Sequence, residues 1–424
     1  MEMLHSVHPP KIAIIGSGIA GLSAAYLLRQ HYHVTLYEKE GRLGGHSRTI
    51  RLPHPNRDIM VDTGFIVFNN ATYPHLSKLF QQLKVDIQSS NMSFAASINQ
   101  GDLEWAGSSL NTWFGQRRNL LNLPMWRGLF DILKFNKNAL QIIERYPHIT
   151  LQEFLKIAGL GRWFQDNYLL PMGAAIWSCP ADQMLQFPAH FFLHFFHNHG
   201  LLSVNRQPTW LTLKNRSMDY IDRLIGIAKP NLILSAGIRA IERLENQVTI
   251  IHADGQQQQV EQVIFACHPQ EIISLLPKVT KQEAAIFNKF SRQKNKVYTH
   301  SDPNWMPRRK KCWSSWNYLT SIQNGEVKTA VTYWMNKLQA IPDHIPLFIT
   351  LNPWRPIAAE KILDVTDFYH PVFDSQTLQA QQEMEKIQGL NRSWFCGAYL
   401  GYGFHEDGIA SSVKLAQKMG ISSW

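Results

Sequence analysis

A glycine motif near the start of the chain constrains the fold more than any other feature. The residues Gly16-Ser-Gly18-Ile-Ala-Gly21 follow a short apolar segment, 11–15, and lead into a helix-forming segment, 22–29. A second strand-like segment, 33–37, ends at Glu38. Short apolar runs of this kind, separated by a glycine turn and a helix, are typical of buried parallel strands. We therefore predict a strand–helix–strand unit over residues 11–38.

Each residue of the motif has its own physical role. Gly16 permits a tight turn, Gly18 lets the backbone approach a pyrophosphate, and Gly21 lets the helix pack closely on the sheet. The helix N-terminus offers free N–H groups to phosphates, and Glu38 can accept hydrogen bonds from ribose hydroxyls. The pattern predicts a Rossmann-type dinucleotide-binding domain. The alternative is a glycine-rich turn in another kind of α/β domain.

A second glycine pair follows directly. Arg42 and the pair Gly44-Gly45 come just after Glu38, so a second set of backbone amides and a basic side chain can reach the same pyrophosphate. Further along the chain, residues 248–268 alternate as strands and end in a buried-type strand, 263–267. The last strand, 393–396, enters a glycine-rich turn and a helix over about 408–418. These pieces predict one nucleotide-binding domain assembled from distant parts of the chain.

With these motifs the chain resembles the flavin amine oxidase superfamily, which includes protoporphyrinogen oxidases and phytoene desaturases. Val61-Asp-Thr-Gly64-Phe65 is similar to the family segment beside the isoalloxazine ring, and residues 395–409 are similar to its C-terminal signature. The resemblance implies an α/β fold with a discontinuous Rossmann-type FAD-binding domain and an α+β substrate lobe. It places the FAD-binding domain at 1–70, 230–290 and 390–424. The substrate domain takes 71–229 and 291–389.

The resemblance also implies which residues contact FAD. They are Gly16, Ser17, Gly18, Ile19, Ala20, Gly21, Glu38, Lys39, Arg42, Leu43, Gly44, Gly45, His46, Ser47, Thr63, Gly64, Phe65, Ile238, Cys267, Gly397, Glu406, Asp407, Gly408 and Ile409. The chain departs from the family at His46, where arginine is common, and at Tyr399, where an acid is common. Cys396 precedes the turn that faces the ring, so we expect noncovalent FAD. No second GxGxxG follows a strand, which leaves oxygen, a quinone or a carrier protein as electron acceptor.

The resemblance names candidates for catalysis as well. Amine oxidases place a lysine opposite the flavin N5 near the start of a strand, and here Asn295-Lys296 occupies that region. If Asn295 faces the flavin, amine oxidation is disfavoured. The alternative for both residues is solvation at a strand edge. Tyr399 and His405, in the C-terminal signature, are the other two candidates.

More narrowly, the chain resembles bacterial FAD-dependent oxidoreductases associated with cyclopropane-fatty-acid-synthase-like methyltransferases. The stretches 62–68, 105–111, 169–177, 315–318 and 401–408 carry this resemblance. It implies dehydrogenation of a fatty acyl chain or membrane lipid, with a fatty-acid-modifying methyltransferase as partner. Two alternatives stay open: a flavin-dependent isomerase of unsaturated fatty acids, and a noncatalytic flavin-binding partner of a lipid-modifying enzyme.

Charge and aromatic content point to a lipid surface. The net charge is +10 and the chain holds 13 Trp, but no helix-turn-helix, zinc-finger or RNA-recognition pattern supports nucleic-acid binding. We expect an amphipathic helix over 124–145, with Arg127, Asp131 and Lys134 on its polar face and Trp126 and Leu133 on its apolar face. Such a helix suits an anionic membrane surface, although helices of this kind more often cover a core. The basic run 308–311 is either a solvated loop or an anion site.

Two further groups of side chains carry weaker signals. His190, His194 and His197 have helical spacing and could hold a metal, but no nearby acid completes the set, so we expect a packed helix and no metal site. The four cysteines are scattered, at 179, 267, 312 and 396, which suits a reducing cytoplasm.

Overall fold

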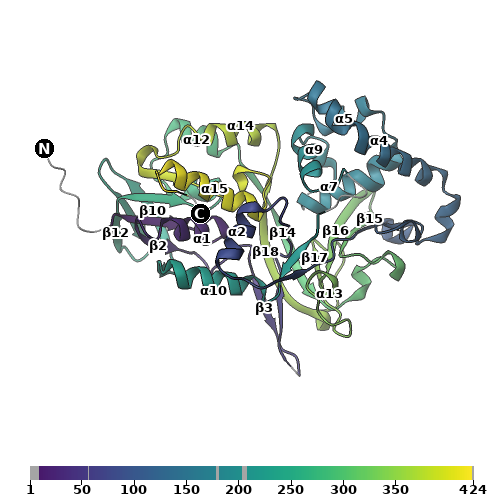
Figure 1. The fold of residues 1–424 in the computed structure, drawn as a ribbon, viewed down its shortest axis with the longest axis horizontal. Helices are drawn as coiled ribbons and strands as arrows, with labels where there is room; N and C mark the ends of the chain where they lie inside the picture. The colour runs from purple at the N-terminus through teal and green to yellow at the C-terminus, as the bar shows by residue number, and fades with distance from the viewer. Residues whose placement is uncertain (1–8, 56, 178–180, 203–207, 423–424) are drawn as a thin grey trace.

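A parallel sheet forms the centre of one half of the molecule. The computed structural model describes residues 9–55, 57–177, 181–202 and 208–422 (Figure 1). The sheet has the strand order β19-β13-β1-β2-β9, and all neighbouring strands are parallel. Its strands are β1 (Lys11–Ile15), β2 (His33–Tyr37), β9 (Asn231–Ile233), β13 (Gln262–Phe265) and β19 (Ser393–Phe395).

Alternate residues of β1 face two different cores. Ile12 and Ile14 belong to the cluster that includes α1 (Ile19–Leu28) and α15 (His405–Lys418). Ala13 and Ile15 belong to a second cluster, with α12 (Lys281–Phe287) and α14 (Ser375–Met384). Because both faces of a parallel strand are covered, its residues read as a continuous apolar run, which is why the sequence located β1 and β2.

Three helices belong to this half although the sequence assigned their residues to the substrate domain. These are α2 (Pro74–Gln82), α10 (Arg216–Ala228) and α14. Leu76 of α2 and Tyr220 of α10 are buried in the same cluster as Ile12, and Met384 of α14 lies in the cluster of Ala13. Figure 1 shows the half that holds α1, α10, α15 and β2 on the left of the view. The boundary between the halves therefore differs from the ranges 71–229 and 291–389.

The other half is built on a mixed seven-stranded sheet. Its order is β18-β14-β17-β16-β15-β6-β7. Its strands are β6 (Phe94–Ile98), β7 (Leu103–Ala106), β14 (Ser291–His300), β15 (Trp316–Gln323), β16 (Glu326–Trp334), β17 (Phe348–Leu351) and β18 (Ile362–Val372). The longest ladder joins β14 to β18, with Asn295 opposite Phe368. The predicted combination of a Rossmann-type domain with a mixed second lobe is confirmed.

Helices cover this second sheet. The main ones are α3 (Leu110–Trp113), α4 (Leu123–Arg145), α5 (Leu151–Ala158), α7 (Leu170–Trp177) and α9 (Ala189–Asn198). Residues of α4, α5, α7 and α9 share one large apolar cluster with β14, β16 and β17. Among the described residues, no helix is both long and apolar enough to cross a bilayer.

The helix expected over 124–145 is present as α4, but its faces differ from the prediction. Asp131, expected on the polar face, is buried and accepts a hydrogen bond from the Gly161 N–H at 3.0 Å. Trp126 and Leu133, which the sequence places on the apolar face, are exposed, so this part of the apolar face does not cover the core. The covered face is centred on Met125, Phe135 and neighbouring residues. Periodicity shows which residues share a face, but it does not fix the rotation of the helix on its neighbours.

Candidate dinucleotide site

The predicted glycine and acid residues meet at one edge of the parallel sheet. Gly16 follows β1, Glu38 follows β2, Cys267 lies two residues beyond the end of β13, and Gly397 lies two residues beyond the end of β19. Because the strands are parallel, these positions all lie at the carboxyl edge. In open α/β sheets, ligands bind in the crevice outside that edge, where connections leave in opposite directions.

The first glycine turn is shaped by close backbone contacts. Gly16 has φ +104°, and a Cβ at Gly21 would come within 1.9 Å of the Gly16 carbonyl oxygen. At Gly18, in contrast, φ is −65° and a Cβ would meet nothing within 4 Å. Gly16 and Gly21 are therefore required by the fold itself, whereas Gly18 faces open space at the N-terminus of α1. That open space fits a ligand phosphate.

The glycine pair Gly44-Gly45 packs directly on the first glycine motif. A Cβ at Gly45 would lie 3.1 Å from the Gly18 Cα, and the Gly44 N–H donates to the Ser17 carbonyl at 3.0 Å. Arg42 donates from Nη1 to the Gly45 carbonyl at 2.9 Å. Two glycine segments and one guanidinium thus border the same space, as the sequence predicted for a bound pyrophosphate.

Glu38 is held rigidly beside this turn. Its Oε2 accepts hydrogen bonds from the Ser17 N–H at 3.0 Å and the Ser17 hydroxyl at 2.6 Å, and its Oε1 accepts from the Glu40 N–H at 2.9 Å. A carboxylate has about four acceptor positions, so one remains for a ribose hydroxyl. Ile238 begins the next strand, β10 (Ile238–Arg243), close by, because the Ala236 N–H donates to the Glu38 carbonyl at 2.8 Å. Lys39 is turned outward and pairs with Glu271 at 2.5 Å.

Residues 46–48 and 63–65 run side by side. The Phe65 N–H donates to the His46 carbonyl at 2.9 Å, and the Thr63 N–H donates to the Arg48 carbonyl at 2.8 Å. A Cβ at Gly64 would lie 2.0 Å from the His46 carbonyl oxygen, so this position requires glycine. Ser47 links to two other elements, with its hydroxyl 2.5 Å from the Tyr220 hydroxyl and 2.7 Å from His405 Nε2.

Three buried polar atoms near the carboxyl edge have no hydrogen-bond partner in the described part of the chain. They are His46 Nε2, His268 Nε2 and the Tyr399 hydroxyl. Tyr399 and His268 lie with their rings 5.9 Å apart, and burial raises the pKa of Tyr399 well above its ordinary value. Unpaired buried polar groups are costly, so a polar ligand that pairs with them fits this edge. Tyr399 otherwise contacts Phe290 and lies in the core cluster around β13, apart from His405.

The N-terminus of α15 meets the N-terminus of α1. A Cβ at Gly408 would lie 2.8 Å from Ile19 Cγ2, and the Ser412 hydroxyl donates to the Ala20 carbonyl at 2.8 Å. Asp407 accepts the Phe404 N–H at 2.8 Å, which starts α15 three residues before the expected position. Glu406 instead accepts the His75 and Leu76 N–H groups and caps α2. The side chains of both acids are thus engaged within the protein, and the helix end leaves its backbone N–H groups for a ligand. Ile409 is fully buried.

Three imidazoles gather next to these segments. His46 stacks on Phe368 at 4.8 Å and lies 5.3 Å from the His370 ring, while His405 stacks on Phe65 at 4.0 Å. Burial lowers the pKa of His46 to about 4 and those of His370 and His405 to about 3. All three rings are therefore neutral near pH 7. His370 was missed by the sequence reading, because β18 carries no motif around it.

Of the two candidate residues on β14, Asn295 faces the interior of the protein and Lys296 faces outward. Asn295 is fully buried, and its Nδ2 lies 2.8 Å from His370 Nδ1. Lys296 is exposed, with its ammonium 5.9 Å from the Tyr298 ring. The buried position beside the histidines thus holds a neutral amide, while the adjacent lysine faces outward.

An aromatic face of the helical lobe lies against the turn before α15. The Trp177 indole N–H donates to the Tyr402 carbonyl at 3.3 Å, and the rings of Phe191 and Tyr402 lie 4.5 Å apart. Phe195 stacks on Phe404 at 4.9 Å. Phe191 and Phe195 lie on α9, where the sequence predicts a packed helix around His190 and His194, and the structure shows what this helix packs against. The second half thus packs aromatic side chains on Tyr402 and Phe404, which directly precede His405.

The other residues singled out in the sequence are the histidines of α9 and the cysteines. His194 and His197 are exposed on α9, and the described residues contain no cluster of three metal-binding side chains. Cys267, Cys312 and Cys396 are free thiols, while Cys179 falls outside the described residues. Burial raises the pKa of Cys396 to about 12, so it remains a protonated thiol.

Comparisons with known proteins agree with this architecture. Residues 14–83 match the family model of an NAD(P)-binding Rossmann-like domain, and no curated protein matches the chain. Three similar solved structures are a CLA-producing fatty acid isomerase from P. acnes, a cofactor-binding mutant of putrescine oxidase, and a cyclohexylamine oxidase from Brevibacterium oxydans IH-35A. The isomerase has 14% identity and a TM-score of 0.69, covering 97% of this chain and 99% of that one. The putrescine oxidase has 14% identity and a TM-score of 0.69, covering 97% and 98%. The cyclohexylamine oxidase has 13% identity and a TM-score of 0.64, covering 97% and 100%.

Proposed function

Because the chain has the fold of the flavin amine oxidase superfamily, we propose that it is an FAD-dependent oxidoreductase acting on a hydrophobic substrate, a fatty acyl chain or membrane lipid. FAD is favoured over a nicotinamide dinucleotide by the second glycine pair, because Gly45 packs so closely on Gly18 that a Cβ at Gly45 would lie 3.1 Å from the Gly18 Cα, which adds backbone to the phosphate side of the site. The unpaired Tyr399 hydroxyl and His268 ring support a ligand with several polar atoms at this edge.

The observation that carries the substrate proposal is the uncharged character of the histidine end of the site. His46, His370 and His405 are neutral there, and the buried position on β14 is Asn295 while Lys296 faces outward. The aromatic face of α7 and α9 packs on Tyr402 and Phe404, next to His405 in the chain. Such surroundings would strip water from a cationic amine with little compensation, whereas they suit an alkyl or alkenyl chain.

The bound flavin would supply hydride acceptance, and the protein would supply position and electrostatics. The N-terminus of α15 would direct N–H groups toward the negative charge of a reduced flavin. Trp177, Phe191 and Phe195 would exclude water and hold an apolar chain. Ser47, held by Tyr220 and His405, would fix the loop that follows Gly45.

The test is anaerobic mixing of the FAD-loaded protein with linoleic acid, with putrescine as the amine comparison, while flavin absorbance is recorded. We expect linoleic acid to bleach the flavin and putrescine to leave it oxidised. Bleaching by putrescine alone would overturn the substrate proposal. Failure to retain any FAD at all would overturn the cofactor proposal as well.

Double-bond isomerisation is the second candidate. It is favoured by the similarity to the P. acnes fatty acid isomerase, which covers 97% of this chain. An isomerase returns the hydride to the substrate, so the same mixing would produce conjugated-diene absorbance without net flavin bleaching. Absence of both signals, with FAD still bound, would instead indicate a noncatalytic flavin-binding protein.

A further inference from the structure

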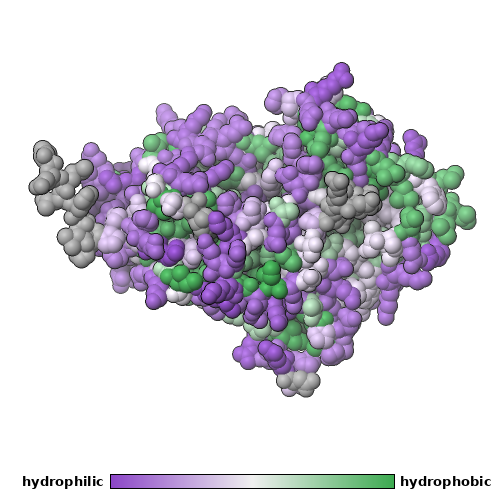
Figure 2. All heavy atoms as spheres, viewed as in Figure 1, coloured by the Kyte–Doolittle hydropathy of each residue, from purple (hydrophilic) through white to green (hydrophobic). Residues whose placement is uncertain are grey.

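Exposed apolar side chains concentrate at one end of the molecule, in the segment that leads into α4. We call this surface the tip, and it comprises Leu110, Leu120, Leu121, Leu123, Trp126, Phe130 and Leu133. Leu121 is 89% exposed and Leu123 is 78% exposed, the highest values among the large apolar side chains of the described residues. Figure 2 shows hydrophobic residues gathered at the right-hand end, where Figure 1 places the segment before α4.

The tip is one continuous surface held by specific contacts. The Trp126 indole N–H donates to the Leu120 carbonyl at 2.9 Å, and the Trp126 ring lies 4.6 Å from Phe114. Arg117 donates to the Phe114 carbonyl at 3.1 Å and to the side chain of Asn111. These bonds tie α3, the short helix η2 (Arg117–Leu121) and α4 together. The leucines are therefore presented by ordered structure.

Exposed apolar and basic side chains lie next to each other along α4, as they do on helices that bind membrane surfaces. Leu123, Trp126, Phe130 and Leu133 are spaced by three or four residues and share one exposed stripe. Arg127, Lys134 and Lys137 are exposed beside that stripe. Long basic side chains next to an apolar stripe can reach phosphate groups while the apolar side chains enter the acyl region.

A second basic segment, distant in sequence, lies beside the tip. The run 308–311 packs on the loop before β7 and on α3. Arg309 donates to the Gly101 carbonyl at 3.3 Å, and a Cβ at Gly115 would lie 3.7 Å from Lys311 Cβ. Arg308, Lys310 and Lys311 are exposed. Neither 105–130 nor 303–325 contains an acidic residue, so basic side chains outnumber acidic ones around the tip. Asp102 and Asp131 are the acids that line the hollows at its base.

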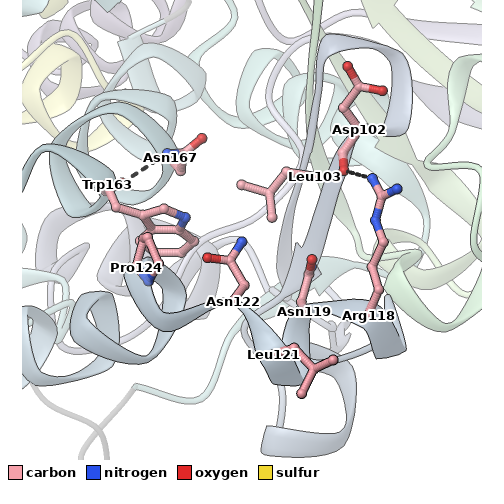
Figure 3. A pocket seen from close by; sticks show the side chains of 9 residues that line it. All are labelled: Asp102, Leu103, Arg118, Asn119, Leu121, Asn122, Pro124, Trp163 and Asn167. Carbon is pink, nitrogen blue, oxygen red and sulfur yellow. Dashed lines mark hydrogen bonds between the residues drawn. The ribbon is translucent and has the colours of Figure 1, made fainter.

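Two open hollows lie at the base of the tip, and Pro124 and Trp163 line both. The first has a volume of about 480 Å³ and combines Arg118, Asn119 and Asn122 with Leu121 and Trp163 (Figure 3). The second, of about 470 Å³, lies between Leu123, Arg127 and Arg162. The indole N–H of Trp163 is buried and has no hydrogen-bond partner among the described residues. Each hollow joins a cation to an exposed leucine, and each also contains one acid, Asp102 in the first and Asp131 in the second. The arginine and the leucine beside it are the pair that would meet a phospholipid headgroup above its glycerol and acyl carbons.

We propose that the tip docks on the surface of an anionic phospholipid bilayer, with the leucines inserted and the two basic segments on the headgroups. Seven exposed large apolar side chains in one contiguous surface rimmed by basic residues are typical of an interaction site. The surrounding positive charge selects an anionic membrane over an uncharged protein partner. The inference stands apart from the proposed chemistry, because it concerns binding alone.

Cosedimentation with vesicles tests this proposal. The full chain is mixed with vesicles of phosphatidylglycerol and phosphatidylcholine in equal parts, and with vesicles of phosphatidylcholine alone. We expect binding to the anionic vesicles, with part of it retained at about 0.5 M salt, where the Debye length is about 4 Å. The double variant Leu121→Ser/Leu123→Ser should lose roughly a hundredfold in partition coefficient, because two leucines no longer leave water. Lys310→Gln/Lys311→Gln should weaken binding only at low salt.

Matched controls separate the tip from general surface properties. Ile227→Ser/Leu244→Ser removes two exposed apolar side chains from the other half of the molecule, and Lys281→Gln/Lys414→Gln removes two exposed charges there. Neither control should change binding. Failure of the unmodified chain to bind anionic vesicles at low salt would overturn the proposal, as would undiminished binding by the double leucine variant. If sedimentation equilibrium shows that the leucines instead hold two copies of the chain together without vesicle binding, the proposal is also wrong.

Discussion

The amide nitrogen of Asn295 lies 2.8 Å from Nδ1 of His370. An amide nitrogen can only donate, so the imidazole accepts at Nδ1 and carries its proton on Nε2. Asn295 is itself oriented by Asn352, whose Nδ2 donates to the Asn295 Oδ1 at 2.6 Å. This chain of neutral groups fixes both the ring orientation and the tautomer of His370 at the buried end of the site.

Replacing Asn295 should therefore lower the free energy of unfolding more than replacing its chain neighbour Lys296. Asn295→Leu leaves His370 and Asn352 with unsatisfied polar atoms, and we expect it to lower the free energy of unfolding by about 2 kcal/mol. It should also slow flavin reduction by linoleic acid. Lys296→Met, at an exposed position, should change stability by less than about 0.5 kcal/mol. Urea unfolding and anaerobic flavin reduction of both variants check this, and equal effects would contradict the assigned register.

Acid should destabilise the folded protein. Burial lowers the pKa of His46, His199, His268 and His300 to about 4 and that of His370 and His405 to about 3. Between about pH 4 and 6.5 the unfolded chain therefore binds more protons on these rings than the folded chain, and stability falls as the pH falls. Asp62 and Asp407 act in the opposite direction, because burial raises their pKa to about 6.

The six histidines outweigh the two acids, so we expect the free energy of unfolding to fall by several kcal/mol between about pH 7 and pH 5. Urea unfolding at the two pH values measures it. His370→Gln should make the dependence shallower, because one depressed imidazole is removed. A protein that is more stable at the lower pH would contradict the neutral state of the buried rings.

Substitutions at two glycines of the first motif should have different effects, one on FAD binding and the other on stability. Gly18→Val places a side chain in open space, so the FAD-free protein should stay within about 1 kcal/mol of the native stability but lose the flavin spectrum. Gly21→Val forces a Cβ to within 1.9 Å of the Gly16 carbonyl oxygen, and we expect more than about 3 kcal/mol of destabilisation. Thermal unfolding without FAD, followed by FAD titration, separates the two. Normal FAD binding by Gly18→Val would show that the cofactor lies elsewhere.

The sequence was most informative where local geometry and chemistry coincide. Gly16, Gly21 and Glu38 could be recognised because a tight turn, a close helix contact and a predicted hydrogen bond to a ribose each favour one residue type at one spacing. Asp131 was misplaced because the rotation of α4 depends on Trp163, which packs where a Cβ at Gly128 would lie, within 2.2 Å. His370 gave no signal, since its role arises only from the pairing of β18 with β14. Sequence periodicity does not predict contacts between segments that are distant in the chain.

The flavin should be released by acid precipitation. A covalent bond requires a reactive nucleophile at the ring, and the described cysteines are unsuited to this role. Cys396 is buried as a protonated thiol, and burial also raises the pKa of Cys312, to about 11. Flavin fluorescence should appear in the supernatant after trichloroacetic acid treatment, and fluorescence that stays with the pellet would contradict a noncovalent cofactor.

The fully buried carboxylate of Glu104 should stabilise the tip indirectly. It accepts hydrogen bonds from the Arg308 N–H at 2.6 Å, the Arg309 N–H at 3.2 Å and the Arg309 guanidinium at 2.8 Å. These bonds hold the basic run beside α3. Glu104→Gln substitutes a donor amide group for one acceptor oxygen and removes the charge, so we expect a loss of about 2 to 4 kcal/mol in the free energy of unfolding.

The same variant should bind anionic vesicles more weakly, because the run 308–311 is no longer fixed next to the leucines. Glu326→Gln is the matched control, since Glu326 is 72% exposed and its pairing with Lys328 is screened by water. That control should leave stability within about 0.5 kcal/mol of the native value and should leave vesicle binding unchanged. Urea unfolding and cosedimentation on the same samples compare the two changes. Full vesicle binding by a destabilised Glu104→Gln protein would show that the position of the basic run does not matter for docking.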